Sequence, residues 1–230
     1  MGREIHFGLG KSCGSLCRIQ PSREMIVRTL ASIVAFLSAA EPALAHHVID
    51  GKMPTNSFEG LMSGLGHPII GVDHLAAVIA VGCLAASQWR GALMVLGYVV
   101  AMVIGAAAHI GEATVAGAEI YVALSVVALG VVLFRARAVR VDVAIALFAF
   151  AGLVHGYALG ESIAGAQAEP LYGYFIGLML IQSVIGLVAM EVTRMLTART
   201  ALQPTLARVL GALVIGIGLA VLVRQVVLGA

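Results

Sequence analysis

The chain has 230 residues, of which 60% are hydrophobic and only 11% are charged. This composition excludes an ordinary soluble domain, and the 27 glycines suit closely packed transmembrane helices. The formal charge of +2 does not indicate a nucleic-acid partner, because five of the fourteen basic residues precede residue 46 and the remainder of the chain is formally neutral. We therefore expect an all-α integral membrane protein surrounded by a lipid bilayer.

Residues 1–45 have the pattern of a leader, in which residues 25–45 form the signal peptide proper. A short basic stretch at 25–28 precedes an apolar core at 29–40, and Ala43-Leu44-Ala45 is an A-x-A cleavage site. We predict cleavage between Ala45 and His46. The alternative is an uncleaved first transmembrane helix.

The rest of the chain, 46–230, is predicted to be a single transmembrane domain. A helix needs about 20 apolar residues to cross the hydrocarbon core. Six spans meet this pattern, the third being the shortest; they lie near 68–87, 90–109, 119–134, 141–160, 171–193 and 206–224. The stretch 58–87 is too long for one straight crossing, so 56–66 is predicted to be a short interfacial or re-entrant helix before the first span.

Arginine positions predict the orientation of these spans. A cleaved signal leaves the new N-terminus outside, so the connections after spans one, three and five lie inside. Those connections carry seven arginines: Arg90, Arg135, Arg137, Arg140, Arg194, Arg199 and Arg208. The outer segments carry only Lys52 and Arg224, so the positive-inside rule agrees with the signal peptide. We expect a multi-pass protein of a bacterial-type inner membrane with its mature N-terminus in the periplasm.

Every histidine after the leader falls on this outer side, where acidic loop residues would also concentrate cations. They are His46, His47, His67, His74, His109 and His155. This asymmetry is what a cation-capture site open to the outside would produce.

The densest ligand cluster is the motif His67-Pro-Ile-Ile-Gly71-Val-Asp73-His74. Ionisable groups in a bilayer are costly and usually functional, and imidazole with carboxylate suits first-row divalent metals. The two histidines are seven residues apart, so on one helix they would share a face. Gly71 allows a close backbone approach, and Asp73 would bind metal or orient His74. The alternative is that His67 caps the helix and Asp73–His74 is a satisfied buried pair.

A second cluster combines His155 and Glu161 with a small-residue ridge, Gly152, Gly156 and Gly160. Such a ridge brings a neighbouring helix close, and we expect that neighbour to be the first span. The five side chains His67, Asp73, His74, His155 and Glu161 would then share one metal. Metal–nitrogen bonds are about 2 Å long, so the hypothesis requires His74 and His155 within about 10 Å of each other. The alternative is a packing face with an incidental histidine.

Further candidate ligands are weaker, because loop carboxylates are usually only solvated. They are His109, Glu112 and Glu119 around the second connection, and the N-terminal pair His46 and His47.

Three segments together resemble the HupE/UreJ family of nickel/cobalt permeases. They are the motif 67–75 followed by Ala80-Val81-Gly82, the third-span pattern across 118–130, and His155-Gly-x-Ala-x-Gly-Glu161. The resemblance implies a six-helix bundle with a signal peptide that admits Ni²⁺ or Co²⁺ by facilitated diffusion, and it implies the same five metal residues. The chain departs from the family where it has Leu159 in place of a second histidine and Val78 in place of a methionine.

We therefore predict a secondary permease for Ni²⁺ or Co²⁺, binding its metal transiently and holding no permanent cofactor. The chain has no Walker A motif for ATP and no nucleophile–base constellation, so it is not expected to be an enzyme. Two alternatives stay open. One is a non-transporting accessory subunit of a larger membrane complex. The other is a haem protein that uses His67 or His74 with His155. Homo-oligomerisation is also left open.

Overall fold

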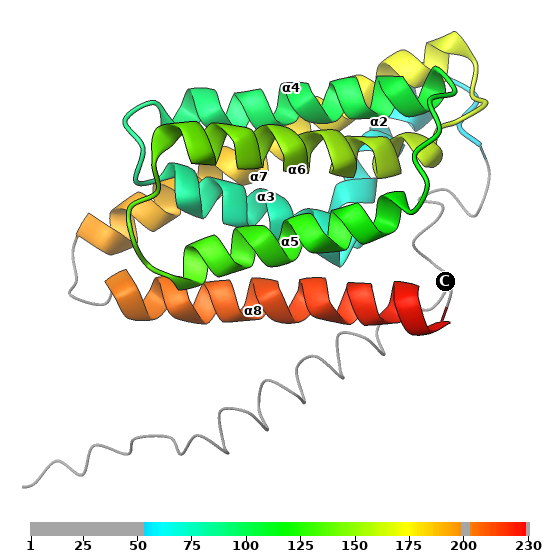
Figure 1. Ribbon diagram of the computed structural model, residues 1–230. Helices are drawn as coiled ribbons and strands as arrows, with labels where there is room; N and C mark the ends of the chain where they lie inside the picture. The colour runs from blue at the N-terminus through cyan, green and yellow to red at the C-terminus, as the bar shows by residue number, and fades with distance from the viewer. Residues whose placement is uncertain (1–52, 199–202, 229–230) are drawn as a thin grey trace, which may run out of the picture.

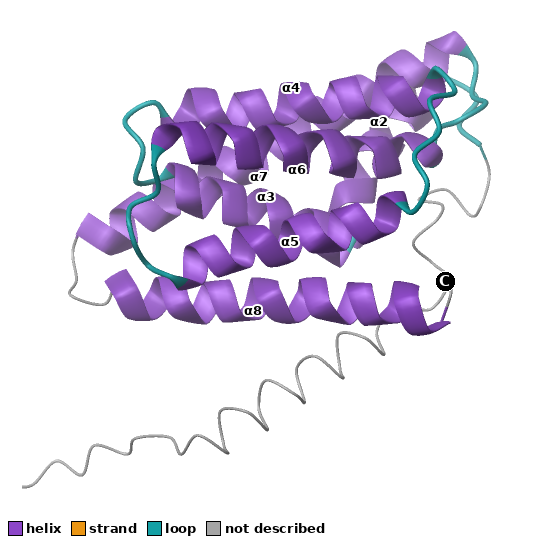
Figure 2. Cartoon of the chain, viewed as in Figure 1, coloured by secondary structure: helices purple, strands orange, loops and turns teal. Residues whose placement is uncertain are grey.

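The computed structural model describes residues 53–198 and 203–228, and within these ranges the chain is helical without strands (Figure 2). The helices are α2 (Ser57–Ile70), α3 (Val72–Ala85), α4 (Gly91–Ile110), α5 (Ala118–Phe134), α6 (Val141–Glu161), α7 (Ala168–Ala198), α8 (Gln203–Val223) and the π-helical turn η1 (Arg224–Leu228). The predicted leader 1–45, the signal peptide 25–45, the cleavage site at Ala45, and His46 and His47 all lie outside the described residues.

Four helices in the described ranges, α4, α6, α7 and α8, are long and apolar enough to cross a membrane. The pair α2 and α3 would make a fifth span if counted together, but it is bent by 80°. Helix α5 is apolar and only 17 residues long. The protein is therefore a multi-pass all-helical membrane protein. The predicted count of six spans is not confirmed, since α5 is short and the first span is broken.

The predicted first span, 68–87, is wrong at its start, because it joins the end of one helix to the whole of the next. Pro68 lies inside α2 rather than in the first turn of a span. The proline has no N–H to donate, which weakens the last turn of α2. Gly71 then takes an extended conformation (φ −72°, ψ 101°), and α3 begins at Val72. The chain therefore turns sharply at Gly71.

Helix α3 is the centre of the bundle, and the other helices surround it as three closely packed pairs: α4 with α6, α2 with α7, and α5 with α8 (Figure 1). Nearly all of α3 from Ala76 to Ala85 is buried. A helix that is hydrophobic all round is expected in such a central position.

Glycines permit the close approach within the pairs. A Cβ atom at Gly60 or Gly64 would collide with the backbone of α7, and one at Gly173 or Gly177 would collide with the backbone of α2. The α2–α7 pair therefore depends on small residues on both helices.

The two ends of the bundle differ in charge. The α3–α4 and α5–α6 connections, the C-terminal end of α7 and the N-terminal end of α8 lie together at one end (Figure 1). The α4–α5 and α6–α7 connections lie at the opposite end. Arg90, Arg135, Arg137 and Arg140 all belong to connections at the first end. We call this the arginine end and the other the acidic end, where Glu112 and Glu161 are exposed.

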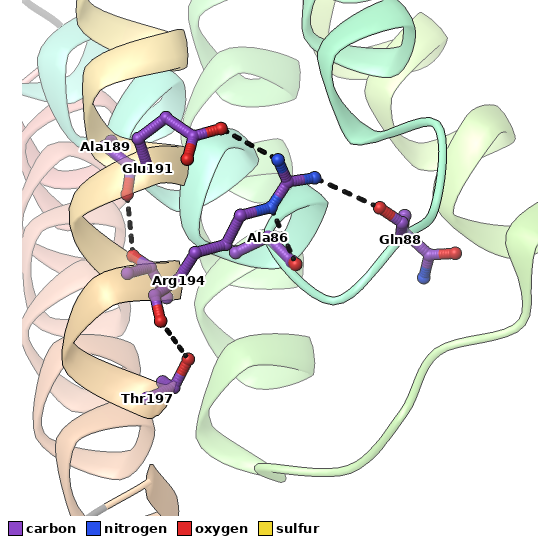
Figure 3. A network of polar contacts seen from close by, with 7 residues as sticks. Ala86, Gln88, Ala189, Glu191, Arg194 and Thr197 are labelled. Atoms are coloured by element: carbon purple, nitrogen blue, oxygen red, sulfur yellow. Dashed lines mark hydrogen bonds and ion pairs between the residues drawn. The ribbon is translucent and has the colours of Figure 1, made fainter. Parts of the chain in front are cut away.

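At the arginine end, one side chain of α7 fastens the turn between α3 and α4 (Figure 3). Arg194 donates from Nε to the carbonyl of Ala86 (3.2 Å) and from Nη2 to that of Gln88 (3.3 Å), while Nη1 pairs with Glu191 (2.8 Å). The last carbonyls of a helix have no partner within it, so this arginine caps the end of α3.

Candidate metal site

Two imidazoles from distant parts of the chain meet inside the bundle. His74 on α3 and His155 on α6 have their Nδ1 atoms 2.7 Å apart, and their rings are nearly perpendicular with centroids 4.9 Å apart. His155 is fully buried and His74 is 9% exposed. The prediction that these two side chains lie within about 10 Å of each other is confirmed.

The hydrogen bonds around this pair determine where its protons lie. Ser125 on α5 donates its hydroxyl hydrogen to the carbonyl of Val122 (2.8 Å). The same oxygen lies 2.9 Å from His155 Nε2, and it must accept there because its hydrogen is already used. His155 therefore carries its proton on Nε2 and presents a lone pair at Nδ1. His74 donates Nδ1–H to that lone pair and keeps Nε2 as a free lone pair.

A carboxylate stands beside the pair. Asp73 lies in the first turn of α3, and its Oδ1 accepts the backbone N–H of His74 at 2.9 Å. The preceding Gly71 leaves room for both side chains, because a Cβ there would lie 2.7 Å from His74 Cδ2 and 3.3 Å from Asp73 Oδ1. The position combines two imidazoles and a nearby negative charge within the membrane protein, a combination that favours a cation.

The glycine ridge of α6 faces a different helix from the one predicted. A Cβ at Gly152 would lie 2.5 Å from the carbonyl oxygen of Tyr98, one at Gly160 would lie 2.8 Å from that of Ala106, and one at Gly156 would collide with the backbone of Met102. The ridge therefore seats α6 on α4, and the expectation that it packs on the first span is wrong. Because His155 is next to Gly156 of the ridge, this contact between α4 and α6 sets the position of His155 along the bundle, where it meets α3.

His67 is separated from His74 by the break in the helix. It lies in the last turn of α2, and its carbonyl accepts the N–H of Gly71 (3.0 Å). The prediction that His67 and His74 share one helix face is wrong, because the axes of their two helices differ by 80°.

The other candidate residues lie toward the acidic end. Glu161 is the last residue of α6 and is exposed, as is Glu112 in the α4–α5 connection, while Glu119 is half-buried at the start of α5. The ring of His109 packs at 4.6 Å on that of Tyr157 and lies beside Gly160. Over residues 53–198 and 203–228, no group of three or more His, Cys, Asp and Glu side chains is arranged to hold one metal ion. The predicted five-residue shell is therefore not assembled in this structure.

Several buried polar side chains were not singled out from the sequence. Among them are Ser125, Tyr98 and Gln182, with exposed fractions of 1%, 0% and 0%. Each is a polar residue inside an otherwise apolar span. That signal is present in the sequence, although an isolated serine or tyrosine in a membrane helix usually has only a packing role.

Comparison with known proteins identifies the family of this chain. The family model described as HupE / UreJ protein matches residues 34–221. Protein HupE of Rhizobium leguminosarum bv. viciae is 27% identical over 165 residues, which cover 70% of this chain and 81% of that protein. No solved structure is significantly similar to the chain. Because the family model covers most of the sequence, the chain belongs to the HupE/UreJ family, whose members are associated with nickel and cobalt transport.

Proposed function

We propose that this protein is a secondary, non-ATP-driven permease for Ni²⁺ or Co²⁺ that binds its cargo at His74 and His155, with Asp73 supplying negative charge. The observation that carries the proposal is the 2.7 Å separation of the two Nδ1 atoms. Two aromatic nitrogens at this distance repel each other unless a proton or a metal cation lies between them. A metal ion can therefore bind between the rings once His74 carries its proton on Nε2 in place of Nδ1, so that both Nδ1 lone pairs face the ion.

The spacing suits a metal with ligands at right angles. With metal–nitrogen bonds of about 2.0–2.1 Å, two cis ligands at 90° stand roughly 2.9 Å apart, whereas tetrahedral ligands stand roughly 3.4 Å apart. The observed distance is nearer the first value. Tetragonal and octahedral coordination is typical of Ni²⁺ and accessible to Co²⁺, and tetrahedral coordination is typical of Zn²⁺. The 2.7 Å is the length of the hydrogen bond between the two rings, and only a small separation would bring them to the spacing of cis ligands. On this ground we propose nickel or cobalt rather than zinc.

The bundle also suggests a direction of entry. His155 lies six residues, about 9 Å of helix, before the end of α6 at the acidic end. Exposed carboxylates there, including Glu112 and Glu161, would raise the local concentration of cations. In our proposal this end faces the periplasm, the arginine end faces the cytoplasm, and the protein sits in the inner membrane of a bacterium.

The form of the haem alternative that uses His74 with His155 is disfavoured by the same distance. Two axial ligands of one haem iron stand about 4 Å apart, nitrogen to nitrogen, on opposite faces of the porphyrin. His74 and His155 are in direct hydrogen-bond contact, with their rings 4.9 Å apart, which leaves no room for a macrocycle between them.

Metal accumulation in cells that express the chain tests the proposal against the accessory-subunit alternative. We expect uptake of Ni²⁺ or Co²⁺ above that of cells lacking the protein, and less stimulation by Zn²⁺. His74→Phe and His155→Phe keep a planar ring but remove its nitrogens, so each should abolish the added uptake. His109→Phe is the matched control, since the His109 ring packs on Tyr157 rather than on another imidazole.

Membrane content of each variant is measured in parallel by immunoblot. Normal uptake by well-inserted His74→Phe and His155→Phe variants would refute the proposed site. No uptake by the wild-type chain would favour the accessory subunit.

A further inference from the structure

Three side chains in the described part of the bundle have buried polar atoms without hydrogen-bond partners. These atoms are the hydroxyl of Tyr98 on α4, Nδ1 of His109 at the end of α4, and both amide atoms of Gln182 on α7. Of the three residues, Tyr98 and Gln182 are fully buried, and His109 is half-buried. Folded proteins satisfy nearly all such groups, because an unsatisfied buried polar atom loses its hydration and gains nothing in return. The three unpartnered atoms on the two fully buried residues, Tyr98 and Gln182, therefore require an explanation.

The helix register brings these two residues to the level of His74. A Cβ at Gly186 on α7 would lie 2.6 Å from Val95 on α4 and 3.4 Å from Val78 on α3, so these three residues mark one level of the bundle. Helices α3 and α7 run toward the arginine end, and α4 runs back (Figure 1).

The next residues on these faces lie one helical turn closer to the acidic end than Gly186, Val95 and Val78. They are Gln182 on α7, Tyr98 on α4 and His74 on α3. Residues three or four apart occupy the same helix face, so all three side chains belong to the faces that meet.

Gln182 also lies opposite the break between α2 and α3. One turn earlier on its face, Leu178 approaches Gly64 of α2, and one turn later Gly186 approaches Gly82 of α3. Tyr98 also lies close to the part of α6 that carries His155, because its carbonyl contacts Gly152, which is one turn before His155. The two orphaned side chains therefore flank the histidine pair on the side of α4 and α7.

We propose that Tyr98 and Gln182 form a polar station that hydrogen-bonds the water ligands of the metal held at His74 and His155, and that this station selects an ion that keeps its waters. The proposal rests on the permease function proposed above. A phenol and an amide offer both donors and acceptors, and outer partners of this kind orient the ligands of a metal. Because they carry no charge, they assist binding without trapping the ion, as conduction requires.

The station would also contribute to metal choice. An ion with two imidazole ligands at right angles retains several waters if it is octahedral, whereas tetrahedral Zn²⁺ retains fewer. Hydrogen bonds to those waters therefore favour Ni²⁺ or Co²⁺. Removing the station should weaken Ni²⁺ binding more than Zn²⁺ binding.

The test measures binding and stability separately on the purified full chain. Gln182→Met and Tyr98→Phe replace the orphaned atoms with apolar ones of similar shape. Titration calorimetry should show Ni²⁺ affinity lower by about 10- to 100-fold, the range for loss of an outer-shell partner, with a smaller loss for Zn²⁺. The metal-free variants should unfold at a higher temperature than the wild type, because an unsatisfied buried group has been removed.

Two matched controls show whether the changes in unfolding temperature and in the Ni²⁺ to Zn²⁺ affinity ratio are specific to Tyr98 and Gln182. Tyr174→Phe removes a hydroxyl that donates to the carbonyl of Leu159 at 2.7 Å, so it should lower the unfolding temperature and leave the Ni²⁺ to Zn²⁺ affinity ratio unchanged. Leu178→Met changes a fully buried residue one turn from Gln182 and should leave the same ratio unchanged.

Three outcomes would overturn the station. The first is an unchanged Ni²⁺ to Zn²⁺ ratio in both station variants, which overturns the station alone. The second is a lower unfolding temperature of metal-free Gln182→Met or Tyr98→Phe, which would show that the polar atoms have structural partners. The third is a wild-type protein that binds neither metal, which overturns the proposed function together with the station.

Discussion

Replacing Ser125 by alanine tests the arrangement of protons inferred for the histidine pair. In the wild type, the Ser125 oxygen accepts from His155 Nε2 at 2.9 Å, and this bond keeps the lone pair of His155 on Nδ1, facing His74. Alanine removes that acceptor. His155 is then free to carry its proton on Nδ1, which blocks the nitrogen that the proposal assigns to the metal.

The size of the effect follows from the burial of the imidazole. His155 is fully buried, so losing the acceptor leaves its N–H unsatisfied at a cost of about 1–3 kcal/mol. For a chain of this length, each kcal/mol lowers the unfolding temperature by about 2–4 °C. Metal affinity should fall by about 10- to 100-fold, as for other hydrogen-bond partners of metal-binding histidines.

The assay is Ni²⁺ titration of purified wild-type, Ser125→Ala, Ser125→Thr and Ser63→Ala proteins, with thermal unfolding in parallel. Ser125→Thr keeps the hydroxyl and should retain most of the affinity. Ser63 is a buried serine on α2, a helix that carries neither histidine of the pair, so Ser63→Ala should bind as the wild type does. Wild-type affinity in Ser125→Ala would refute the assigned tautomers.

Three further predictions concern the residues around the pair. Gly156→Ala should lower stability by about 1–3 kcal/mol and reduce metal uptake, because its Cβ would collide with the backbone of Met102. Thermal unfolding should show no such loss for Gly97→Ala on α4, where a Cβ meets nothing within 4 Å. Asp73→Asn should abolish uptake while the protein still inserts, since the amide keeps the size but not the charge; uptake at wild-type level in well-inserted protein would contradict this. Leu159→His adds an imidazole one helical turn from His155 and should change Ni²⁺ affinity or the Ni²⁺ to Zn²⁺ ratio in calorimetry.

Helices whose apolar runs end at polar or glycine-rich connections were predictable from the sequence. The predicted spans at 90–109, 119–134 and 141–160 differ by at most one residue from α4, α5 and α6, because polar or glycine-rich connections interrupt the apolar runs there. The broken first span was not predictable in the same way. Pro68 by itself indicates the first turn of a helix, where its missing N–H costs little, whereas in the last turn of α2 it removes a hydrogen bond. What decides between them is the packing of α2 on α7, a contact between residues more than a hundred positions apart.

The histidine pair was predictable only in part. The arginine pattern predicts that both residues lie in the outer half of the membrane, and from this prediction we expected His74 and His155 to lie together. The helix on which the glycine ridge packs was not predictable, because small residues indicate that some helix approaches closely and do not indicate which one. The ridge packs on α4, which also has a small residue at the contact: a Cβ at Gly105 would collide with the backbone of Leu153 on α6. The shared five-residue shell was inferred from a continuous first helix, and the break at Gly71 removes the shared face on which His67 depended.

The break gives α3 its position in the site. A continuous helix across α2 and α3 would be roughly 43 Å long, against a hydrocarbon core of about 30 Å. The bend at Gly71 instead starts α3 within the bundle, and it places Asp73 and His74 in the first turn. The N-terminus of a helix is the positive end of its dipole and repels cations. Asp73 opposes that field at the point where it is strongest, and its Oδ1 satisfies a backbone N–H that no helical carbonyl reaches. A broken helix would by itself be an anion site, and the aspartate beside the histidine pair is what makes this one suited to a metal cation.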